Sequence, residues 1–148
     1  PITGNTISNF GTTVTGLSGY VGVSGTINGI QITNQLNANV SYNFITSSVG
    51  GVTTTATLRG IYYRQSAAPT SGSWSSTLIN NSISLRHGAA GGAVLGIADE
   101  TGSAFNSLTI SNNDFHTSGW TVAATGAFTG INNTVAEQNV TINGNTFT

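Results

Sequence analysis

The chain has 148 residues, enough for one domain with its own core, and 37% of them are hydrophobic. Only 5% are charged, against about 25% in a typical soluble domain, and the net charge of −1 leaves no basic surface for a nucleic acid. Cysteine is absent, which excludes disulfides and thiolate metal sites, and no apolar run reaches the roughly 18 residues of a membrane span, so we expect no membrane insertion.

A segment with asparagine between two apolar residues recurs along the whole chain. In chain order its copies are residues 2–7, 40–45, 78–83, 110–115 and 142–147. The aligned asparagines are Asn5, Asn43, Asn81, Asn113 and Asn145, which are 38, 38, 32 and 32 residues apart. Each copy is predicted to form a short strand whose alternate residues point inward, and the recurrence predicts that successive turns of chain stack on one another.

A second segment alternates with the first. It has the pattern small, apolar, any residue, Gly, Ile, and it occurs at residues 26–30, 57–61, 93–97 and 127–131. The glycine indicates either a corner of the backbone or a place too crowded for a Cβ atom. Between the two kinds of segment, residues 46–56, 64–76, 86–92 and 116–126 are rich in Gly, Ser, Thr and Ala and are predicted to be loops.

The aligned asparagines are predicted to form a ladder at one corner of the stack. Asparagine tolerates the left-handed backbone conformation of a tight bend, so we expect these residues to adopt it. Their side chains are also expected to hydrogen-bond from coil to coil, at about 1 kcal/mol net for each bond. Around this corner, two sets of residues are expected to face a common interior: Leu108, Ile110 and Phe115, and Val140, Ile142 and Phe147.

The two alternating segments resemble the right-handed parallel β-helix repeat family, which includes pectate-lyase-like enzymes, phage tailspikes and bacterial surface adhesins. The resemblance covers nearly all of residues 1–148 and implies a single all-β domain: a right-handed parallel β-helix, or solenoid, of about four to five coils with long loops. Repeats of 32 to 38 residues are longer than the coils usual in that family, so the excess is expected to leave as loops. The main alternative is an antiparallel sandwich built from hairpins.

No catalytic or metal-binding constellation is evident in the sequence. The only acids are Asp99, Glu100, Asp114 and Glu137, and we interpret them as solvated corner residues, one of them pairing with Arg86. The paired carboxylates of glycosidases, and the acidic and arginine sites of the lyase branch, are not found. His87 and His116 are interpreted as loop residues, because two histidines alone make a poor metal site. We therefore expect no enzyme activity, metal or cofactor.

Aromatic residues provide the candidate ligand-binding surface. Trp74 and Trp120 fall in predicted loops, and Tyr62 and Tyr63 follow a Gly-Ile segment beside Arg64. Exposed aromatic faces next to hydrogen-bonding groups suit the binding of glycans. The alternative is that these rings cover the apolar surface of the loops themselves.

The leading functional interpretation is an extracellular structural or adhesive module of a surface protein or filament. The chain begins in one Asn segment and ends in another without a capping element, which predicts a segment of a longer chain or a fibre subunit that contacts itself or further repeats head-to-tail. The alternative is a carbohydrate-active β-helix that binds or cleaves polysaccharide. Ice binding, suggested by Thr-rich residues 53–55, lacks a threonine recurring once in every repeat.

Overall fold

The computed structural model describes residues 1–11, 25–54, 56–65 and 71–148. These residues form strands β1 to β16 and contain no helix, so none of them belongs to a helix long and apolar enough to cross a membrane. Every strand pairing is parallel. Parallel pairing throughout excludes the sandwich of antiparallel hairpins.

The strands belong to three main sheets and one small one. Sheet A contains, in spatial order, β1 (Ile2–Thr3), β4 (Asn39–Ser41), β7 (Trp74–Ile79), β11 (Asn106–Ser111) and β15 (Asn139–Asn143). Sheet B contains β2 (Thr6–Phe10), β5 (Phe44–Ser47), β8 (Ser82–Ser84), β12 (Asp114–Phe115) and β16 (Thr146–Phe147). Sheet C contains β3 (Ile27–Thr33), β6 (Leu58–Arg64), β10 (Val94–Thr101) and β14 (Phe128–Asn133). Sheet D pairs β9 (Arg86–His87) with β13 (Gly119–Trp120).

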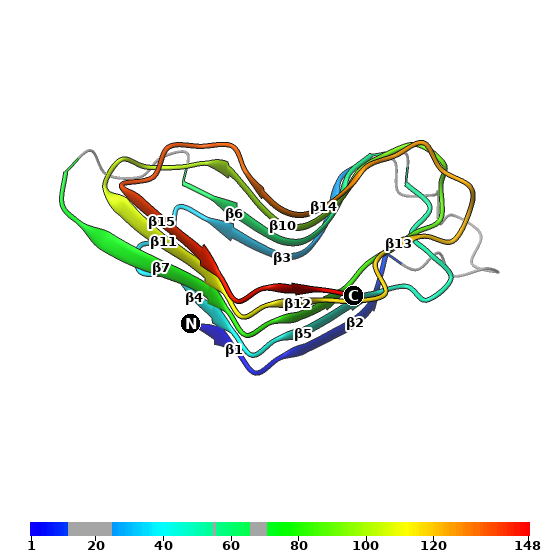
Figure 1. The fold of residues 1–148 in the computed structure, drawn as a ribbon, viewed down its shortest axis with the longest axis horizontal. Helices are drawn as coiled ribbons and strands as arrows, with labels where there is room; N and C mark the ends of the chain where they lie inside the picture. Colours follow the sequence, from blue (N-terminus) through cyan, green and yellow to red (C-terminus); the bar gives the residue numbers. More distant parts are fainter. Residues whose placement is uncertain (12–24, 55, 66–70) are drawn as a thin grey trace.

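The chain visits the main sheets in the order A, B, C and then returns to A beside its previous strand, which makes the fold a parallel β-solenoid, or β-helix. Sheets A and B meet at an angle, and sheet C lies across from them (Figure 1). Equivalent residues of successive repeats are in register. The first apolar residue of the Asn segment forms one column that joins Ile2, Val40, Leu78, Ile110 and Ile142. The sequence repeat is therefore the structural repeat.

The core is continuous through the middle coils and open at the last one. Leu108, Ile110 and Phe115 are buried, as their positions in the repeat predict. The equivalent residues of the last coil are not: Val140 is 41% exposed, Ile142 48% and Phe147 55%. These three residues continue the inward columns, as predicted, and they stay partly exposed because no further coil covers them in the structure.

The glycines of the second segment lie inside the strands of sheet C, so they mark crowding rather than a corner. Gly60 and Ile61 are both buried, which interrupts the strict in–out alternation of β6. A Cβ atom on Gly60 would lie 2.6 Å from the carbonyl oxygen of Gly96 and 2.8 Å from Cγ2 of Ile83. The strands of sheet C are curved, and their middle approaches sheets A and B (Figure 1).

The predicted loops contain more regular structure than their composition suggested. Each of the four overlaps at least one strand. In chain order, the first overlaps β5, the second overlaps both β6 and β7, the third overlaps β9 and the fourth overlaps β13. Val52 is buried and forms a parallel bridge to His87. Valine and the threonines that follow it are β-branched and therefore suit a strand as well as a loop. Residues 55 and 66–70 of the predicted loops lie outside the described part of the chain.

Candidate functional site

The asparagine ladder runs along the corner where sheet A turns into sheet B. The Oδ1 atom of Asn43 accepts hydrogen bonds from the backbone N–H of Asn5 at 3.1 Å and from its Nδ2 at 3.0 Å. The same pair of bonds joins Asn43 to Asn81, Asn81 to Asn113 and Asn113 to Asn145, at 2.9–3.1 Å. In every rung the earlier coil donates and the later coil accepts, so the ladder has a direction.

The second proton of each ladder amide is also used. Nδ2 of Asn81 donates to the carbonyl oxygen of Val40 at 3.0 Å, and Nδ2 of Asn113 donates to that of Leu78 at 2.9 Å. The three inner rungs are buried, and each amide group is satisfied at both ends. Such a network is worth more than isolated surface hydrogen bonds, because breaking it leaves buried polar groups without partners.

The left-handed residue of this corner is the one before each ladder asparagine, not the asparagine itself. The residues with positive φ are Gly4 at 66°, Tyr42 at 57°, Asn80 at 56°, Asn112 at 55° and Gly144 at 61°. The prediction placed the left-handed conformation one residue too late. The bend occurs first, and it aims the following asparagine into the stack.

A second group of polar side chains is buried between the end of sheet C and the start of sheet A. Asp99, on β10, points inward and is 0% exposed. Its Oδ2 accepts a hydrogen bond from Nδ2 of Asn133 at 3.0 Å, whereas its Oδ1 is buried without a partner. The pKa of Asp99 is raised to about 7, chiefly by burial and in smaller part by the charges of Glu137 and Glu100. The interpretation of Asp99 as a solvated corner residue was therefore wrong.

Glu137 lies near this group, in the connection between β14 and β15. Its Oε2 accepts a hydrogen bond from the backbone N–H of Ser103 at 3.1 Å, and its Oε1 is buried without a partner in hydrogen-bonding geometry. Burial raises the pKa of Glu137, an effect that the Ser103 N–H and the nearby Asn106 amide partly offset. The charge of Glu137 is one of the causes that raise the pKa of Asp99, which places the two carboxylates within electrostatic reach of each other.

Tyr63 links the remaining members of this group. Its hydroxyl donates to Oγ of Ser76 at 2.8 Å and accepts from Nδ2 of Asn106 at 3.1 Å, and burial is the main cause that raises the pKa of Tyr63. Gln65, just after β6, is buried as well. We call the set of Tyr63, Gln65, Asp99, Asn106 and Glu137 the corner cluster. Sequence analysis missed it because its members come from three different repeats and share no motif.

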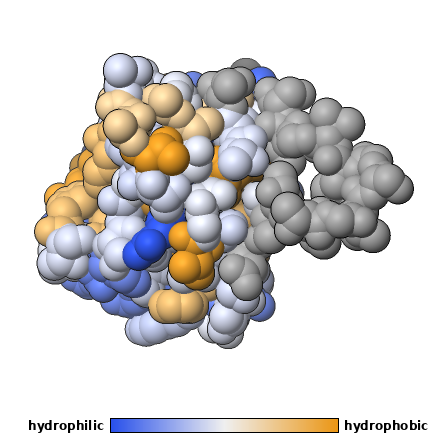
Figure 2. Space-filling model, turned by 90° about the vertical axis from the view of Figure 1, so that its right-hand side faces the viewer, coloured by the Kyte–Doolittle hydropathy of each residue, from blue (hydrophilic) through white to orange (hydrophobic). Residues whose placement is uncertain are grey.

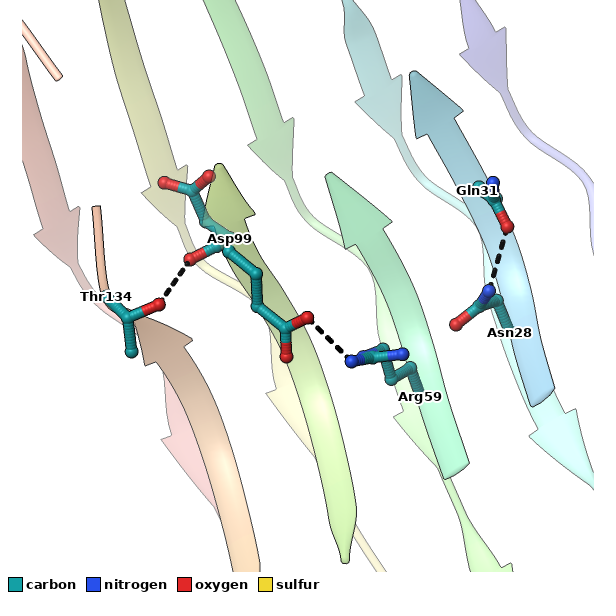
Figure 3. Close-up of polar contacts among 6 residues, drawn as sticks. Asn28, Gln31, Arg59, Asp99 and Thr134 are labelled. Carbon is teal, nitrogen blue, oxygen red and sulfur yellow. Dashed lines mark hydrogen bonds and ion pairs between the residues drawn. The ribbon is translucent and has the colours of Figure 1, made fainter. Parts of the chain in front are cut away.

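The outer face of sheet C has its own polar contacts (Figure 3). Nη2 of Arg59 pairs with Oε2 of Glu100 at 2.6 Å, and the guanidinium lies 4.5 Å from the ring centroid of Tyr62. The sequence predicted that an acid pairs with Arg86. An acid does pair with an arginine, but the arginine is Arg59, so the predicted residue was wrong. On β3, Nδ2 of Asn28 donates to Oε1 of Gln31 at 2.9 Å. These contacts pair polar side chains within β3 and between the neighbouring strands β6 and β10.

The aromatic candidates for glycan binding do not form one surface. Tyr63 is 0% exposed and Trp74, in strand β7, is 6% exposed, so neither can stack on a ligand and both predictions were wrong. Both residues lie on the same face of their strands as buried neighbours. Alternation along the sequence could therefore have indicated that they are buried. Tyr62 and Arg64 remain accessible on β6, whereas Trp120 lies in a different sheet, on β13.

Trp120 is half-buried beside His87, with ring centroids 6.4 Å apart. It lines an open hollow of about 480 Å³ together with Arg86 and residues 117–121. His87 itself is buried in strand β9, and its Nδ1 accepts the backbone N–H of Ala89 at 3.1 Å, so the interpretation of His87 as a loop residue was wrong. Figure 2 views the molecule from this side and shows small apolar patches separated by polar residues.

Within the described ranges no three His, Asp or Glu side chains gather as a metal-binding group. Comparison of the chain with protein-family profiles, curated proteins and solved structures returned no match in any of the three. The fold and these local arrangements are therefore the basis for a functional proposal.

Proposed function

We propose that this chain is a structural β-helical module of an extracellular surface protein or filament, and that its end coil pairs with a further coil of the same repeat. The observation that carries the proposal is the exposed last coil. Val140, Ile142 and Phe147 continue columns that are fully buried one coil earlier, yet they are 41%, 48% and 55% exposed. Large apolar side chains at adjacent positions favour covering by another surface.

Both ends of the stack are hollowed, and inward apolar side chains contribute to each hollow. Residues of the first two coils, among them Ile2, Ile32 and Val40, line a hollow of about 620 Å³. At the other end, Ile131, Ile142 and Phe147 line one of about 490 Å³. These hollows are the interior of the solenoid where it meets solvent, and an added coil of the same repeat has side chains of the right kind to fill them.

The ladder supports the same proposal through its direction. Asn145 has no next rung to which its backbone N–H and Nδ2 can donate in the described residues, whereas Asn5 accepts no rung bond on its Oδ1. The donor end and the acceptor end are complementary. A further coil with asparagine at the same position would continue the ladder and would bury Phe147, as Phe147 now stacks on Phe115 at 4.9 Å between ring centroids.

The experiment compares two lysine substitutions on the last strand of sheet A. Ile142→Lys places a charge on the inward column, and Thr141→Lys places the same charge on the adjacent residue, whose side chain alternates to the outer face of β15. Sedimentation velocity and electron microscopy of the 148-residue chain are expected to show head-to-tail assemblies for the parent and for Thr141→Lys, and monomers for Ile142→Lys. A parent chain that stays monomeric at high concentration, or equal behaviour of the two variants, would contradict the proposal.

The adhesive part of the proposal concerns the open hollow at Trp120. A half-buried indole next to the hydroxyls of Thr117, Ser118 and Thr121 offers both an apolar face and hydrogen-bonding groups, which suits a sugar ring. Glycan-array binding by the parent, lost in Trp120→Ala and retained in Tyr62→Ala, would support glycan binding at this hollow. Binding that is unchanged by Trp120→Ala would place the ligand elsewhere.

A further inference from the structure

The corner cluster concentrates oxygen atoms that receive no hydrogen bond. In the described part of the chain, five buried side-chain oxygens lack a partner, and four of them belong to this cluster: Oε1 of Gln65, Oδ1 of Asp99, Oδ1 of Asn106 and Oε1 of Glu137. Gln65, Asp99 and Asn106 are 2%, 0% and 0% exposed. A buried acceptor without a donor is destabilising, so four in one place need a physical explanation.

Several nearby donors pair with the other atoms of the same side chains. The Asn133 amide donates to the second oxygen of Asp99 and the Ser103 N–H to the second oxygen of Glu137. The Asn106 amide nitrogen donates to the hydroxyl of Tyr63, which in turn donates to Ser76. Among the atoms of the corner cluster itself only oxygens remain unpaired, although Nε1 of Trp74, the residue in register with Asn106, is also buried without a partner.

In the described residues no ion pair neutralises Asp99 or Glu137. The described ion pairs join Arg59 to Glu100 on the outer face of sheet C and His116 to Asp114, and neither involves Asp99 or Glu137. Two carboxylates held in the interior without a cationic partner repel each other and lose hydration. A bound cation would remove both penalties and would give the unpaired amide oxygens a partner.

We propose that the corner cluster binds one calcium ion, with carboxylate ligands from Asp99 and Glu137 and amide-oxygen ligands from Asn106 and Gln65. An all-oxygen set of mixed charge suits a hard cation, and calcium tolerates six to eight ligands in irregular geometry, whereas magnesium requires a near-ideal octahedron. Zinc is not favoured, because both histidines lie outside the cluster. Glu137 is only half-buried and offers the ion a route from solvent.

The ligands come from separate coils, so the ion would act as a clamp. Gln65 follows β6, Asp99 and Asn106 belong to β10 and β11, and Glu137 precedes β15. These positions span three successive turns of the solenoid. The ion would join them at the corner between sheets C and A, in addition to the backbone hydrogen bonds that already link these coils.

The test is the thermal unfolding of the whole chain with CaCl2 added after treatment with EDTA, together with calcium titration calorimetry. We expect one ion per chain and a melting temperature that rises with calcium concentration. Glu137→Gln, in a connection outside the strands, is expected to lower calcium affinity by at least about tenfold. Asp114→Asn, which removes an equal charge from a residue outside the cluster, is expected to leave the affinity unchanged.

Asn106→Asp provides a test of opposite sign. It adds a third carboxylate to the same position, so the variant should be less stable in EDTA than the parent and should bind calcium more tightly. The proposal is overturned if the parent shows no calcium-dependent shift at millimolar concentration. It is equally overturned if MgCl2 gives the same shift as CaCl2, or if Glu137→Gln and Asp114→Asn respond alike.

Discussion

Replacing Asn81 by alanine removes the central rung of the ladder. Its Oδ1 accepts two hydrogen bonds from Asn43, at 3.1 and 2.9 Å, and its Nδ2 donates to the carbonyl oxygen of Val40 at 3.0 Å and to Oδ1 of Asn113 at 2.9 Å. At about 1 kcal/mol net for each bond, the loss amounts to about 4 kcal/mol. The substitution also leaves the buried N–H of Asn43 without a partner. We therefore expect the free energy of unfolding to fall by at least this amount.

The matched control is Asn139→Ala. Asn139 lies on β15, is exposed, and makes one side-chain hydrogen bond, of 3.3 Å, to Oγ of Ser107. Its loss is expected to change stability by less than about 0.5 kcal/mol. Urea unfolding followed by circular dichroism gives both values, and unchanged m-values would show that compactness is retained. A loss below about 1.5 kcal/mol for Asn81→Ala, or equal losses in the two variants, would refute the assignment of the ladder as a main source of stability.

Three further predictions can be measured in the same unfolding assay. Gly96→Ala should destabilise the chain by about 1–3 kcal/mol, because its new Cβ would overlap the ring of Phe115, and a neutral effect would contradict the crowding. In the monomer, Ile110→Ala should lower the free energy of unfolding by about 2–5 kcal/mol and Ile142→Ala by about 1 kcal/mol, because the two residues share a column but only Ile110 is buried. Similar losses in the two variants would mean that the last coil is covered. Tyr42→Gly should raise stability by about 0.5–1 kcal/mol, because it relieves a left-handed backbone at an exposed aromatic residue, and a loss would show that the ring contributes more than the strain.

The stacking register could be predicted because a solenoid repeats its requirements in every coil. A buried rung needs the same amide at the same place each time, so Asn43, Asn81 and Asn113 are visible as a pattern. The residue at the bend before each asparagine is less restricted in type. Tyr42 and Asn80 both adopt the left-handed conformation there, and this variety conceals which residue of the corner is left-handed.

The corner cluster could not be predicted in the same way. Asp99 occupies an inward position that Tyr63 holds one coil earlier and Asn133 one coil later, so the column has no common side chain. Glu137 comes from a connection whose path the sequence does not define. Alternation along a strand would have indicated that Trp74 is buried, because it is in phase with Leu78, but its Ser- and Gly-rich surroundings suggested a loop.

Unequal coil lengths have a consequence for how such a molecule can vary. Rungs are 38 residues apart in the first two repeats and 32 in the last two, yet the columns of sheet A remain in register. Residues are therefore gained or lost at the connections without shifting the strands. Peptides grafted at one connection of consecutive coils would be displayed in a row at intervals of about 4.8 Å, so the stack provides a scaffold with fixed spacing.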